Sequence, residues 1–510
     1  MNDQLVMLSD EFKNPTSLAG AANLKGVGYG SDKIREYRPL RECTSTGSVS
    51  YGIVQPGQHV ENGVPIIRVN NINNGIVDIT NPLKVHHQID EKHRKTKLEG
   101  GEVLLSLVGT TGQCIVAGPE LKGWNVARAI AVIKPAQDIS AEWLSICLKS
   151  EEAQHFLDSR ANTTVQKTLN LQDVREIPIM QVTEAEERYI LEWWITLNDK
   201  IEINRRMNET LEAMAQALFK SWFVDFDPVL DNAILAGNPI PEEFAERAAM
   251  RKEILAQNQN DELGVMSDEL AQHSALKTHH SEFPSGFTHT EKLGWIPEGW
   301  EVGSIADLCS TVTDGSHHSP KSVDKEFGLP MASSKDLSEI GINYESCRYI
   351  SREDFSILER NGCSPQDGDV LIAKDGARCG ETSCIHGEEA PIVLLSSVAI
   401  LRPITPNLST FLNTLMSRAE SVADLRENYV SGSAIPRIIL RDFKRFPIIT
   451  FPSSILELWV QFSQSLHQKS VDSHKQSQTL SRLRDTLLPK LISGELRIPE
   501  AEKLAEEALT

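Results

Sequence analysis

Two groups of polar side chains have types that could contact nucleic acid, and one group lies in each half of the chain. Base edges are read by Asn, Gln, Arg, Lys, Ser and Thr, whereas phosphates bind Lys, Arg and backbone amides. The first group comprises Asn70, Asn71, Lys84, Arg94, Lys95, Thr110, Thr111, Gln113, Arg128, Thr164, Gln166 and Lys167. The second comprises Ser316, His317, Lys335, Lys374, Arg378, Ser396, Ser397, Ser433 and Arg437. Each group as a whole favours contact with DNA, although any single member also fits an ordinary surface loop.

The two groups differ in residue type at matching places. VGTTGQ at 108–113 corresponds to KDGARCG at 374–380, and TTVQKTLN at 163–170 corresponds to SGSAIPRI at 431–438. A shared framework with divergent loops is what two domains would need in order to read different short sequences.

Motifs that would give the chain its own chemistry are missing from the sequence. The nearest fragment to an [N/D]PP[Y/F] methyltransferase loop is Asp227-Pro228-Val229, and no GxxxxGK[ST] phosphate loop occurs. PQDGDVLIAK, ending at Lys374, superficially suggests a metal-dependent nuclease, but Ile372 stands where a second carboxylate belongs. The pairs His279-His280 and His317-His318 lack partners at metal-ligand spacing. We therefore expect no catalytic, cofactor-binding or metal-binding residues.

Length and composition describe a multidomain globular protein. The 510 residues exceed what one hydrophobic core organises, so two to four domains are expected. The 40% hydrophobic and 24% charged residues are ordinary proportions. No apolar run is long enough for a membrane span, and the N-terminus does not resemble a secretory signal. The eight scattered cysteines are typical of reduced thiols, so the sequence predicts a cytoplasmic protein.

The net charge of −20 is unevenly distributed. Residues 231–300 carry 12 acidic and 5 basic groups, and residues 495–510 carry 5 and 2, which accounts for half of the excess. Binding to phosphates requires Lys and Arg, so a uniformly acidic surface would argue against DNA. An acidic chain can still bind a duplex that it shares with a basic partner, and the charge therefore suggests a complex.

The second half of the chain repeats the first at a shift of about 265 to 269 residues. NGVPIIRVNNI from Asn62 matches FGLPMASSKDL from Phe327, and GGEVLLSLVGTTG from Gly100 matches DGDVLIAKDGARCG from Asp367. AVIKP (131–135) returns as AILRP (399–403), and LQDVREIPI (171–179) returns as LRDFKRFPI (440–448). Two copies of one domain plus one helix predict a pseudo-two-fold molecule suited to a target with two separated halves.

Short β-rich runs followed by helical patterns predict an α+β fold for each copy. The expected organisation is an N-terminal arm (1–36), a first α+β domain (37–182), a long helix (183–227), an acidic linker (228–299), a second α+β domain (300–452), a second long helix (453–492) and an acidic tail (493–510). The linker should be polar and partly mobile, with a short helix at Glu242 to Gln257.

Apolar residues spaced by three and four predict that the long helices pair as an antiparallel coiled coil. The seam residues are Leu197, Ile201, Leu211, Leu218, Trp222, Leu466, Leu480, Leu483 and Leu487. Asn204, Asn208, Ser473 and Gln476 fall in the same rhythm and would fix the register. Thr183-x-x-Glu186 and Ser454-x-x-Glu457 resemble capping boxes at the helix starts. The alternative is two amphipathic helices that pack on separate cores.

With these features in place, the chain resembles the specificity subunits of type I restriction–modification enzymes across essentially residues 37–498. The segments that carry the resemblance are LNDKIEINRRMNETLEAMAQALFKSWFVDFDPV (197–229), GWIPEGWEVGSIADL (294–308) and LRDTLLPKLISGELRI (483–498). The resemblance implies two target recognition domains, each reading one half of a bipartite DNA site. The helices would form the spacer and dock two modification subunits that methylate adenine. Restriction subunits, acting as ATP-driven translocases and endonucleases, would join them, and S-adenosylmethionine, ATP and Mg²⁺ would belong to these partners.

Three alternatives stay open at this point. The chain could be a single-chain restriction–methylation enzyme or nuclease built on the same recognition domains, which methylation of bases by the purified chain would support. It could be a coiled-coil adaptor that binds only protein. It could also serve a system that methylates without cleaving. The target sequence does not carry over from the family, because recognition loops vary between its members.

Overall fold

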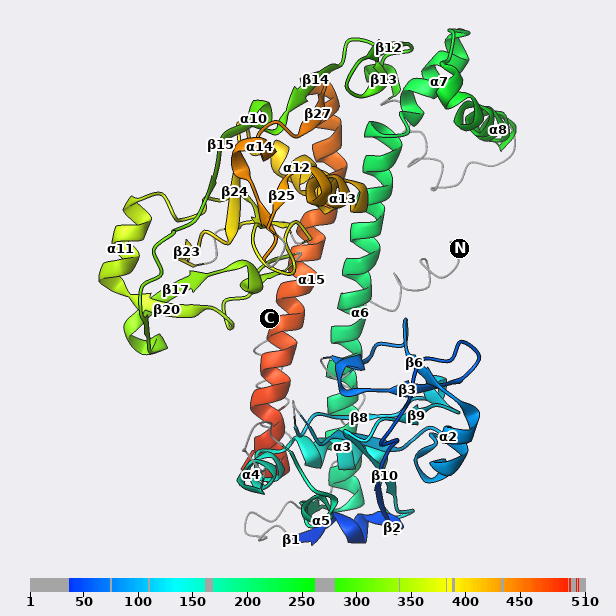
Figure 1. Cartoon of the computed structure of the whole chain (residues 1–510), viewed down its shortest axis with the longest axis vertical. Coiled ribbons are helices and arrows are strands. Elements are labelled where there is room, and N and C mark those ends of the chain that lie inside the picture. Colours follow the sequence, from blue (N-terminus) through cyan, green and yellow to red (C-terminus); the bar gives the residue numbers. More distant parts are fainter. Residues whose placement is uncertain are drawn as a thin grey trace. The chain divides into compact units, whose positions relative to one another are not determined.

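The computed structural model describes residues 36–73, 76–108, 111–160, 168–261, 280–338, 340–381, 383–387, 390–432, 435–493, 495–496, 501 and 503. The expected N-terminal arm and acidic tail lie almost wholly outside these residues. The chain divides into two compact units, of which unit 1 comprises Met1–Lys200 with Thr479–Thr510 and unit 2 comprises Ile201–Gln478. Each unit contains one α+β domain and part of each of two long helices, α6 (Glu184–Phe223) and α15 (Ser453–Ser493) (Figure 1).

The α+β domain of unit 1, hereafter the first domain, is built on a four-stranded antiparallel sheet. Its strand order is β2 (Thr44–Tyr51), β10 (Ile130–Pro135), β7 (Val103–Ser106) and β8 (Cys114–Val116). The sequences IAVIKP and VLLS of the two central strands are apolar, and both strands are largely buried. Helix α3 (Ala141–Lys149) contacts β7, β8 and β10. It begins after Ser140, whose Oγ accepts a hydrogen bond from the Trp143 amide at 3.1 Å.

Smaller sheets complete the first domain. A three-stranded sheet has the order β6 (Leu83–Val85), β3 (Val64–Ile67) and β9 (Asn125–Val126), and β4 (Ile72–Asn73) pairs with β5 (Ile76–Val77). The domain's first and last strands, β1 (Glu36–Pro39) and β11 (Pro178–Gln181), pair with each other. The remaining helices are α2 (His87–Lys92), α4 (Glu151–Arg160) and α5 (Leu171–Arg175).

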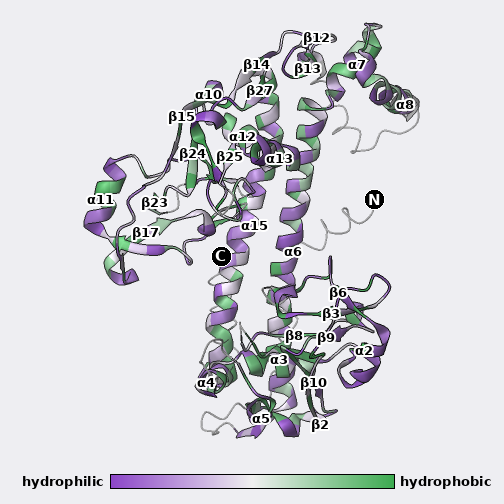
Figure 2. Cartoon of the chain, in the orientation of Figure 1, coloured by the Kyte–Doolittle hydropathy of each residue, from purple (hydrophilic) through white to green (hydrophobic). Residues whose placement is uncertain are grey.

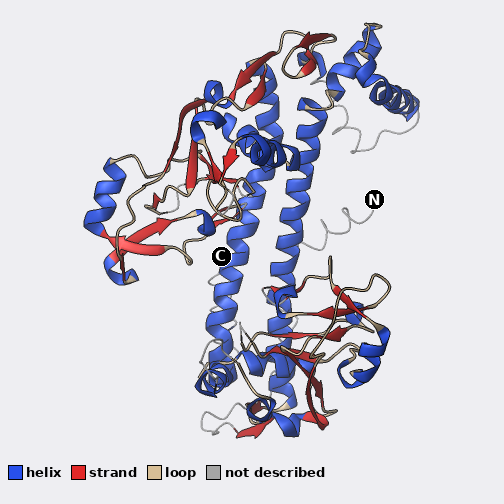
Figure 3. Cartoon of the chain, in the orientation of Figure 1, coloured by secondary structure: helices blue, strands red, loops and turns tan. Residues whose placement is uncertain are grey.

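The second domain, in unit 2, repeats this succession of elements. Its four-stranded sheet has the order β15 (Cys309–Asp314), β24 (Val398–Pro403), β21 (Val370–Ala373) and β22 (Ser383–Ile385). Its other sheets are β16 (Ser322–Val323), β20 (Arg348–Ser351), β17 (Gly328–Ala332) and β23 (Val393–Leu394), then β18 (Leu337–Ser338) with β19 (Gly341–Ile342), β14 (Glu301–Ser304) with β27 (Pro447–Thr450), and β25 (Val430–Ser431) with β26 (Arg437–Ile438). Its helices are α10 (Ile305–Leu308), α11 (Arg352–Arg360), α12 (Leu408–Ser417), α13 (Ala419–Asn428) and α14 (Leu440–Phe443). The predicted α+β duplication is thus confirmed in the four-stranded sheet, the pair of terminal strands and the order of the elements (Figure 3). Strand β16 and the pair of β25 and β26 have no counterpart in the described part of the first domain.

A buried ion pair occupies the same place in both domains. In the first, Glu102 is 4% exposed and lies 3.8 Å from the Lys134 amine. In the second, Asp369 is 1% exposed and accepts two hydrogen bonds from Arg402, at 2.9 and 2.7 Å. In each case a carboxylate at the start of one central strand meets a cation near the end of its neighbour. A buried charge is tolerated only with a partner, so the pair was retained in both copies.

Within unit 2 the two long helices run antiparallel and contact each other directly. Asn204 donates from Nδ2 to Gln476 Oε1 at 2.9 Å, and Ser473 donates to the Asn204 carbonyl at 3.3 Å. Nearer the end of α6, the rings of Trp222 and Phe462 lie 5.8 Å apart. Three of the four polar residues predicted in the seam, Asn204, Ser473 and Gln476, therefore bond across it, whereas the buried Oδ1 of Asn208 has no hydrogen-bond partner among the described residues. Figure 2 shows apolar and polar residues alternating along both helices.

Within unit 1 the same helices meet again. Arg484 donates from Nη1 to Asn198 Oδ1 at 2.8 Å and lies over the Trp194 ring. Among the predicted seam residues, Leu197, Leu211, Trp222, Leu480, Leu483 and Leu487 are buried, whereas Ile201, Leu218 and Leu466 are half-buried. The antiparallel pairing is confirmed within each unit, and the alternative of helices on separate cores is wrong.

The capping predictions met different outcomes at the two helix starts. Thr183 and Glu186 form the expected box, since the Thr183 amide donates to Glu186 Oε2 at 3.0 Å and the Glu186 amide donates to Thr183 Oγ1 at 3.3 Å. Helix α15, in contrast, begins at Ser453, so Ser454 lies inside its first turn and is not the cap. The two adjacent serines made the register of this start ambiguous in the sequence.

Much of the predicted linker is folded. It contains α7 (Asp227–Ala236), α8 (Ala245–Asp261) and the hairpin of β12 (Phe287–Thr290) and β13 (Gly294–Pro297). Val229, Phe283 and Ile296 are buried in an aromatic-rich core that also includes residues of α6, α15 and the second domain. The short helix expected at 242–257 begins as a 3-10 turn at Glu242 and continues as α8 to Asp261. The acidic composition of the linker gave no sign that Val229, Phe283 and Ile296 are buried.

None of the helices in the described part of the chain is both long and apolar enough to cross a bilayer.

Candidate nucleic-acid interface

Loops from separate strands meet at one point in the second domain, here called its loop crossing. It comprises residues 314–319, 374–379, 395–397 and 435–437. The Ser396 amide donates to the Ser316 carbonyl at 2.9 Å, the Lys374 amide to Ser397 at 2.8 Å, and the Ile438 amide to Lys374 at 3.0 Å. Backbone hydrogen bonds thus hold four loops together independently of their side chains.

The first domain contains the same crossing, formed by residues 52–54, 107–113, 127–129 and 168–169, of which 109 and 110 lie outside the described residues. Here the Arg128 amide donates to Ile53 at 2.8 Å, the Leu107 amide to Ala129 at 2.7 Å, and the Leu169 amide to Leu107 at 2.9 Å. The bridges Ile53–Ala127 and Val108–Thr168 correspond to Ser316–Leu395 and Asp375–Arg437. One backbone arrangement therefore carries two different sets of side chains.

A glycine stands at the tightest point of each crossing. A Cβ atom on Gly52 would lie 1.9 Å from the Val126 carbonyl oxygen, and one on Gly315 would lie 2.2 Å from that of Leu394. Real Cβ atoms do not approach backbone so closely, so only glycine fits at either position.

In the second domain the crossing carries a cluster of charges. Lys374 is 3% exposed, and its amine lies 2.8 Å from Asp375 Oδ1 and 3.5 Å from Asp314 Oδ2. Arg437 Nε lies 3.2 Å from Asp375 Oδ1, and His317 Nε2 lies 3.2 Å from Asp314 Oδ2. Buried ammonium groups need charged partners, so the two carboxylates make this buried lysine possible.

The structure brings most of the predicted residues of the second group to this crossing. Ser397 Oγ accepts a hydrogen bond from the Ser334 amide at 3.0 Å, next to the exposed Lys335, and Arg378 donates to the Leu337 carbonyl at 3.3 Å. Ser316 is 6% exposed and donates to His318 within its own loop. Because Ser316 and Lys374 are buried, their side chains stabilise the loops and are not available to DNA. The exposed residues of this group are His317, Lys335, Arg378 and Arg437. Ser433 lies outside the described residues.

The first group is brought together less completely. Asn70, Gln113 and Arg128 are exposed near the crossing, with the half-buried Thr111 beside them. Asn71 is 7% exposed, and its Oδ1 accepts a hydrogen bond from the Arg68 amide, so it shapes the loop. The remaining described members lie on other elements, Lys84 on β6 and Arg94 and Lys95 in a 3-10 turn after α2. Thr110, Thr164, Gln166 and Lys167 lie outside the described residues.

Sequence reasoning missed the carboxylates of the crossing. Asp314 and Asp375 contact three of the predicted residues, Lys374, Arg437 and His317, but carboxylates are not donors to DNA and were therefore not among the predicted residues. The signal was present, because Asp375 directly follows Lys374 and Asp314 lies three residues before His317.

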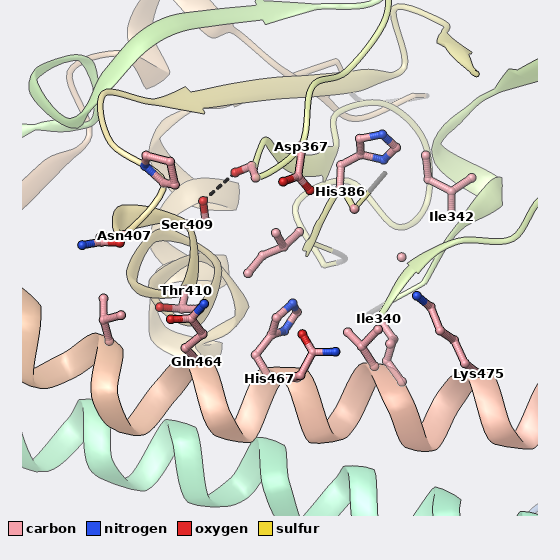
Figure 4. A pocket seen from close by; sticks show the side chains of 18 of the residues that line it. Ile340, Ile342, Asp367, His386, Asn407, Ser409, Thr410, Gln464, His467 and Lys475 are labelled. Atoms are coloured by element: carbon pink, nitrogen blue, oxygen red, sulfur yellow. Dashed lines mark hydrogen bonds between the residues drawn. The ribbon is translucent and has the colours of Figure 1, made fainter. Parts of the chain in front are cut away.

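A separate cavity of about 330 Å³ lies in unit 2 between α15 and loops of the second domain. Figure 4 shows Gln464, His467 and Lys475 of α15 directed toward the loops of Asp367 and His386. Burial lowers the pKa of His467 below its usual value. Packing between domain and helix is thus incomplete here, whereas the aromatic core around Trp459 is close-packed. Across the described residues, no three His, Cys, Asp or Glu side chains gather as metal ligands.

Comparison with known proteins finds one family throughout. The family model described as the type I restriction modification DNA specificity domain matches residues 57–213. The chain is 26% identical over 431 residues to the type I restriction enzyme HindI specificity subunit of Haemophilus influenzae, which covers 79% of this chain and 88% of that protein. It is 24% identical over 407 residues to the MjaIX specificity subunit of Methanocaldococcus jannaschii, covering 78% of each. A crystal structure of the type I restriction–modification S subunit from M. genitalium aligns with a TM-score of 0.43 at 13% identity, over 91% of this chain and 98% of that one.

Proposed function

We propose that this chain is a specificity subunit of a type I restriction enzyme, like the proteins it is similar to, and that its two α+β domains each read one half of a bipartite DNA target. One observation carries the proposal. The loop crossing is built twice on the same backbone hydrogen bonds, yet its side chains are apolar at Leu107 and Val108 and charged at Lys374 and Asp375. A repeated frame with unlike surfaces fits two domains that read unlike half-sites.

The second part of the proposal concerns the two long helices, α6 and α15. We take α6 and α15 as the spacer between the half-sites and as a docking surface for partner subunits. Their lengths of 40 and 41 residues support this role, because each helix contributes residues to both units. The polar contact between Asn204 and Gln476 would keep the two helices in one register.

We propose further that the chain is non-catalytic and directs its partners to the site. The partners would be two methyltransferase subunits that modify adenine and the restriction subunits that translocate and cleave DNA. S-adenosylmethionine, ATP and Mg²⁺ would be used by these subunits. The acidic charge of this chain, −20 in total, supports association with more basic partners on the duplex.

An exchange of domains tests the proposal. Residues 37–182 would be replaced by the corresponding domain of the Haemophilus relative, and the chimaera co-expressed with the modification subunits. Methylome sequencing should show a change in one half of the methylated motif only. The matched exchange of residues 300–452 should change the other half. If both halves change together, the modular proposal is wrong, and methylation by the purified chain alone would instead support a single-chain enzyme.

A further inference from the structure

The two loop crossings differ in charge at the bridge that joins two of their loops. The second domain has Asp375 and Arg437 where the first has Val108 and Thr168. Resting on the function proposed above, we propose that Arg437, oriented by Asp375, contacts a guanine in the half-site that the second domain reads.

The backbone around Arg437 is held on both sides. Arg437 forms an isolated antiparallel bridge with Asp375. Next to it, the Gly376 amide donates to the Pro436 carbonyl at 3.0 Å, and the Ile438 amide donates to the Lys374 carbonyl at 3.0 Å. The Cα of Arg437 therefore has a fixed position relative to the other loops of the crossing. A fixed origin is necessary for a side chain that must distinguish one base edge from another.

The orientation of the guanidinium leaves its outer edge available. Arg437 meets Asp375 through Nε, at 3.2 Å, so the contact does not need the two terminal amino groups. The side chain is 56% exposed. Two terminal N–H donors match the O6 and N7 acceptors of guanine, which is the commonest specific contact of arginine in the major groove.

Asp375 also bears on the choice between a base and a phosphate. Its carboxylate is held in place by the Lys374 amine at 2.8 Å, and its side chain is 13% exposed. A carboxylate beside the guanidinium repels a phosphate oxygen, whereas the acceptors of a guanine edge carry no net charge. The pair therefore favours a base edge over the DNA backbone. Asp375 acts through Arg437 and is a positioning residue.

The first domain cannot make the same contact. Val108 and Thr168 offer no guanidinium, and Leu107 replaces the buried Lys374. The guanine contact of Arg437 should thus belong to one base pair in the half that the second domain reads, whatever the exposed Arg128 contacts in the other half.

The experiment compares variants in the complete complex, co-expressed with the modification subunits, with methylation measured at every genomic site. Arg437→Ala and Arg437→Lys should lose discrimination at one base pair of one half-site by roughly 5- to 150-fold, while the other half stays unchanged. Lysine keeps the charge but not the fork, so it should not rescue. Asp375→Asn should relax the same base pair more weakly, because Arg437 remains but loses its orientation.

Arg441→Ala is the matched control, since this arginine of the same domain is 82% exposed on α14 and pairs with Asp442. It should leave the motif intact. A uniform fall in methylation with every motif position preserved in Arg437→Ala would indicate a phosphate contact and overturn the inference, as would an unchanged motif at unchanged levels. A wild-type complex without a bipartite motif would contradict the proposed function itself. A bipartite motif in the wild type that Arg437→Ala leaves unchanged would contradict only the inference about Arg437.

Discussion

Gly52 and Gly315 stand where two strands of backbone approach most closely, and this gives a prediction at the scale of single residues. Gly52→Ala and Gly315→Ala should each lower the free energy of unfolding by about 1–3 kcal/mol, because the new methyl group can be accommodated only by moving the loops of the crossing. Urea denaturation, followed for each variant against the wild type, measures this loss.

Gly387→Ala serves as the control for both variants. A Cβ atom there meets nothing within 4 Å, and its backbone needs no left-handed conformation. Its stability should match that of the wild type within about 0.5 kcal/mol. Equal losses in all three variants would contradict the assignment of Gly52 and Gly315 to close backbone contacts.

The ion pairs of α7 and α8 give a prediction about pH. Burial alone would raise the pKa of Asp227, but hydrogen bonds from Arg247 and Ser221, with the charges of Arg247 and Arg251, outweigh it and hold the pKa below its usual value of 3.8. A depressed carboxyl pKa contributes stability above pH 3.8 that is lost as the pH falls below it. Asp227→Asn should therefore cost about 1–3 kcal/mol at neutral pH, and its difference from the wild type should shrink in acid. Denaturation curves of the variant and the wild type at neutral pH and below pH 3.8 measure this difference in the free energy of unfolding. A difference that is larger in acid would contradict the prediction.

Side-chain roles at the crossings could be predicted only in part. Arg437 and Arg128 were predicted as donors to DNA from their chemistry alone, and the structure places both of them exposed at the crossings. The roles of Asp314 and Asp375, and the burial of Lys374, depend on partners that the fold brings together from different strands. Such pairings have no local signature in a sequence.

Among the structural elements, the long helices were the most predictable. Their spacing of apolar residues is a one-dimensional property, so the seam and most of the extent followed from it. The first helix was predicted to reach residue 227, but α6 ends at Phe223, and Asp227 begins α7. The segment 228–299 behaved differently. Its burial rests on isolated residues such as Phe283 and Ile296, which find a core only when α6, α15 and the second domain are assembled. The average composition of this segment predicts a polar surface, but it does not predict the contacts of these two residues.

The polar contact in the seam gives a prediction for this element. Gln476→Leu should cost about 1–3 kcal/mol, because Asn204 is 6% exposed and its amide would lose its partner away from water. Asn204→Leu should cost less, since the exposed Gln476 can bond to solvent. The double variant should be at least as stable as the wild type, because both polar groups are then gone.

A double-mutant cycle of melting or urea curves measures these three free energies. If Asn204→Leu proves the more damaging single change, the bond is not what holds the buried amide, and the account of the seam is wrong.

At the scale of the whole molecule, the proposed spacer predicts how target length depends on helix length. Seven residues inserted into each helix, after Lys200 and after Gln478, would lengthen both by about 10 Å and preserve their pairing. The gap between half-sites should then grow by about three base pairs, at 3.4 Å each. Methylome sequencing reads the gap directly. Half-sites unchanged in sequence with an unchanged gap would show that the helices do not set it.

The division into units has one more consequence. The backbone leaves unit 1 along α6, passes through unit 2, and comes back to unit 1 along α15, so β1 and the last turns of α15 share one folded body. Because both ends of the described chain lie in unit 1, they could be joined without separating parts of one folded unit. Joining Met1 to Thr510 by a flexible peptide and opening the backbone between Asp261 and His280 would yield a permuted polypeptide with its halves in reversed order and the contacts within each body intact.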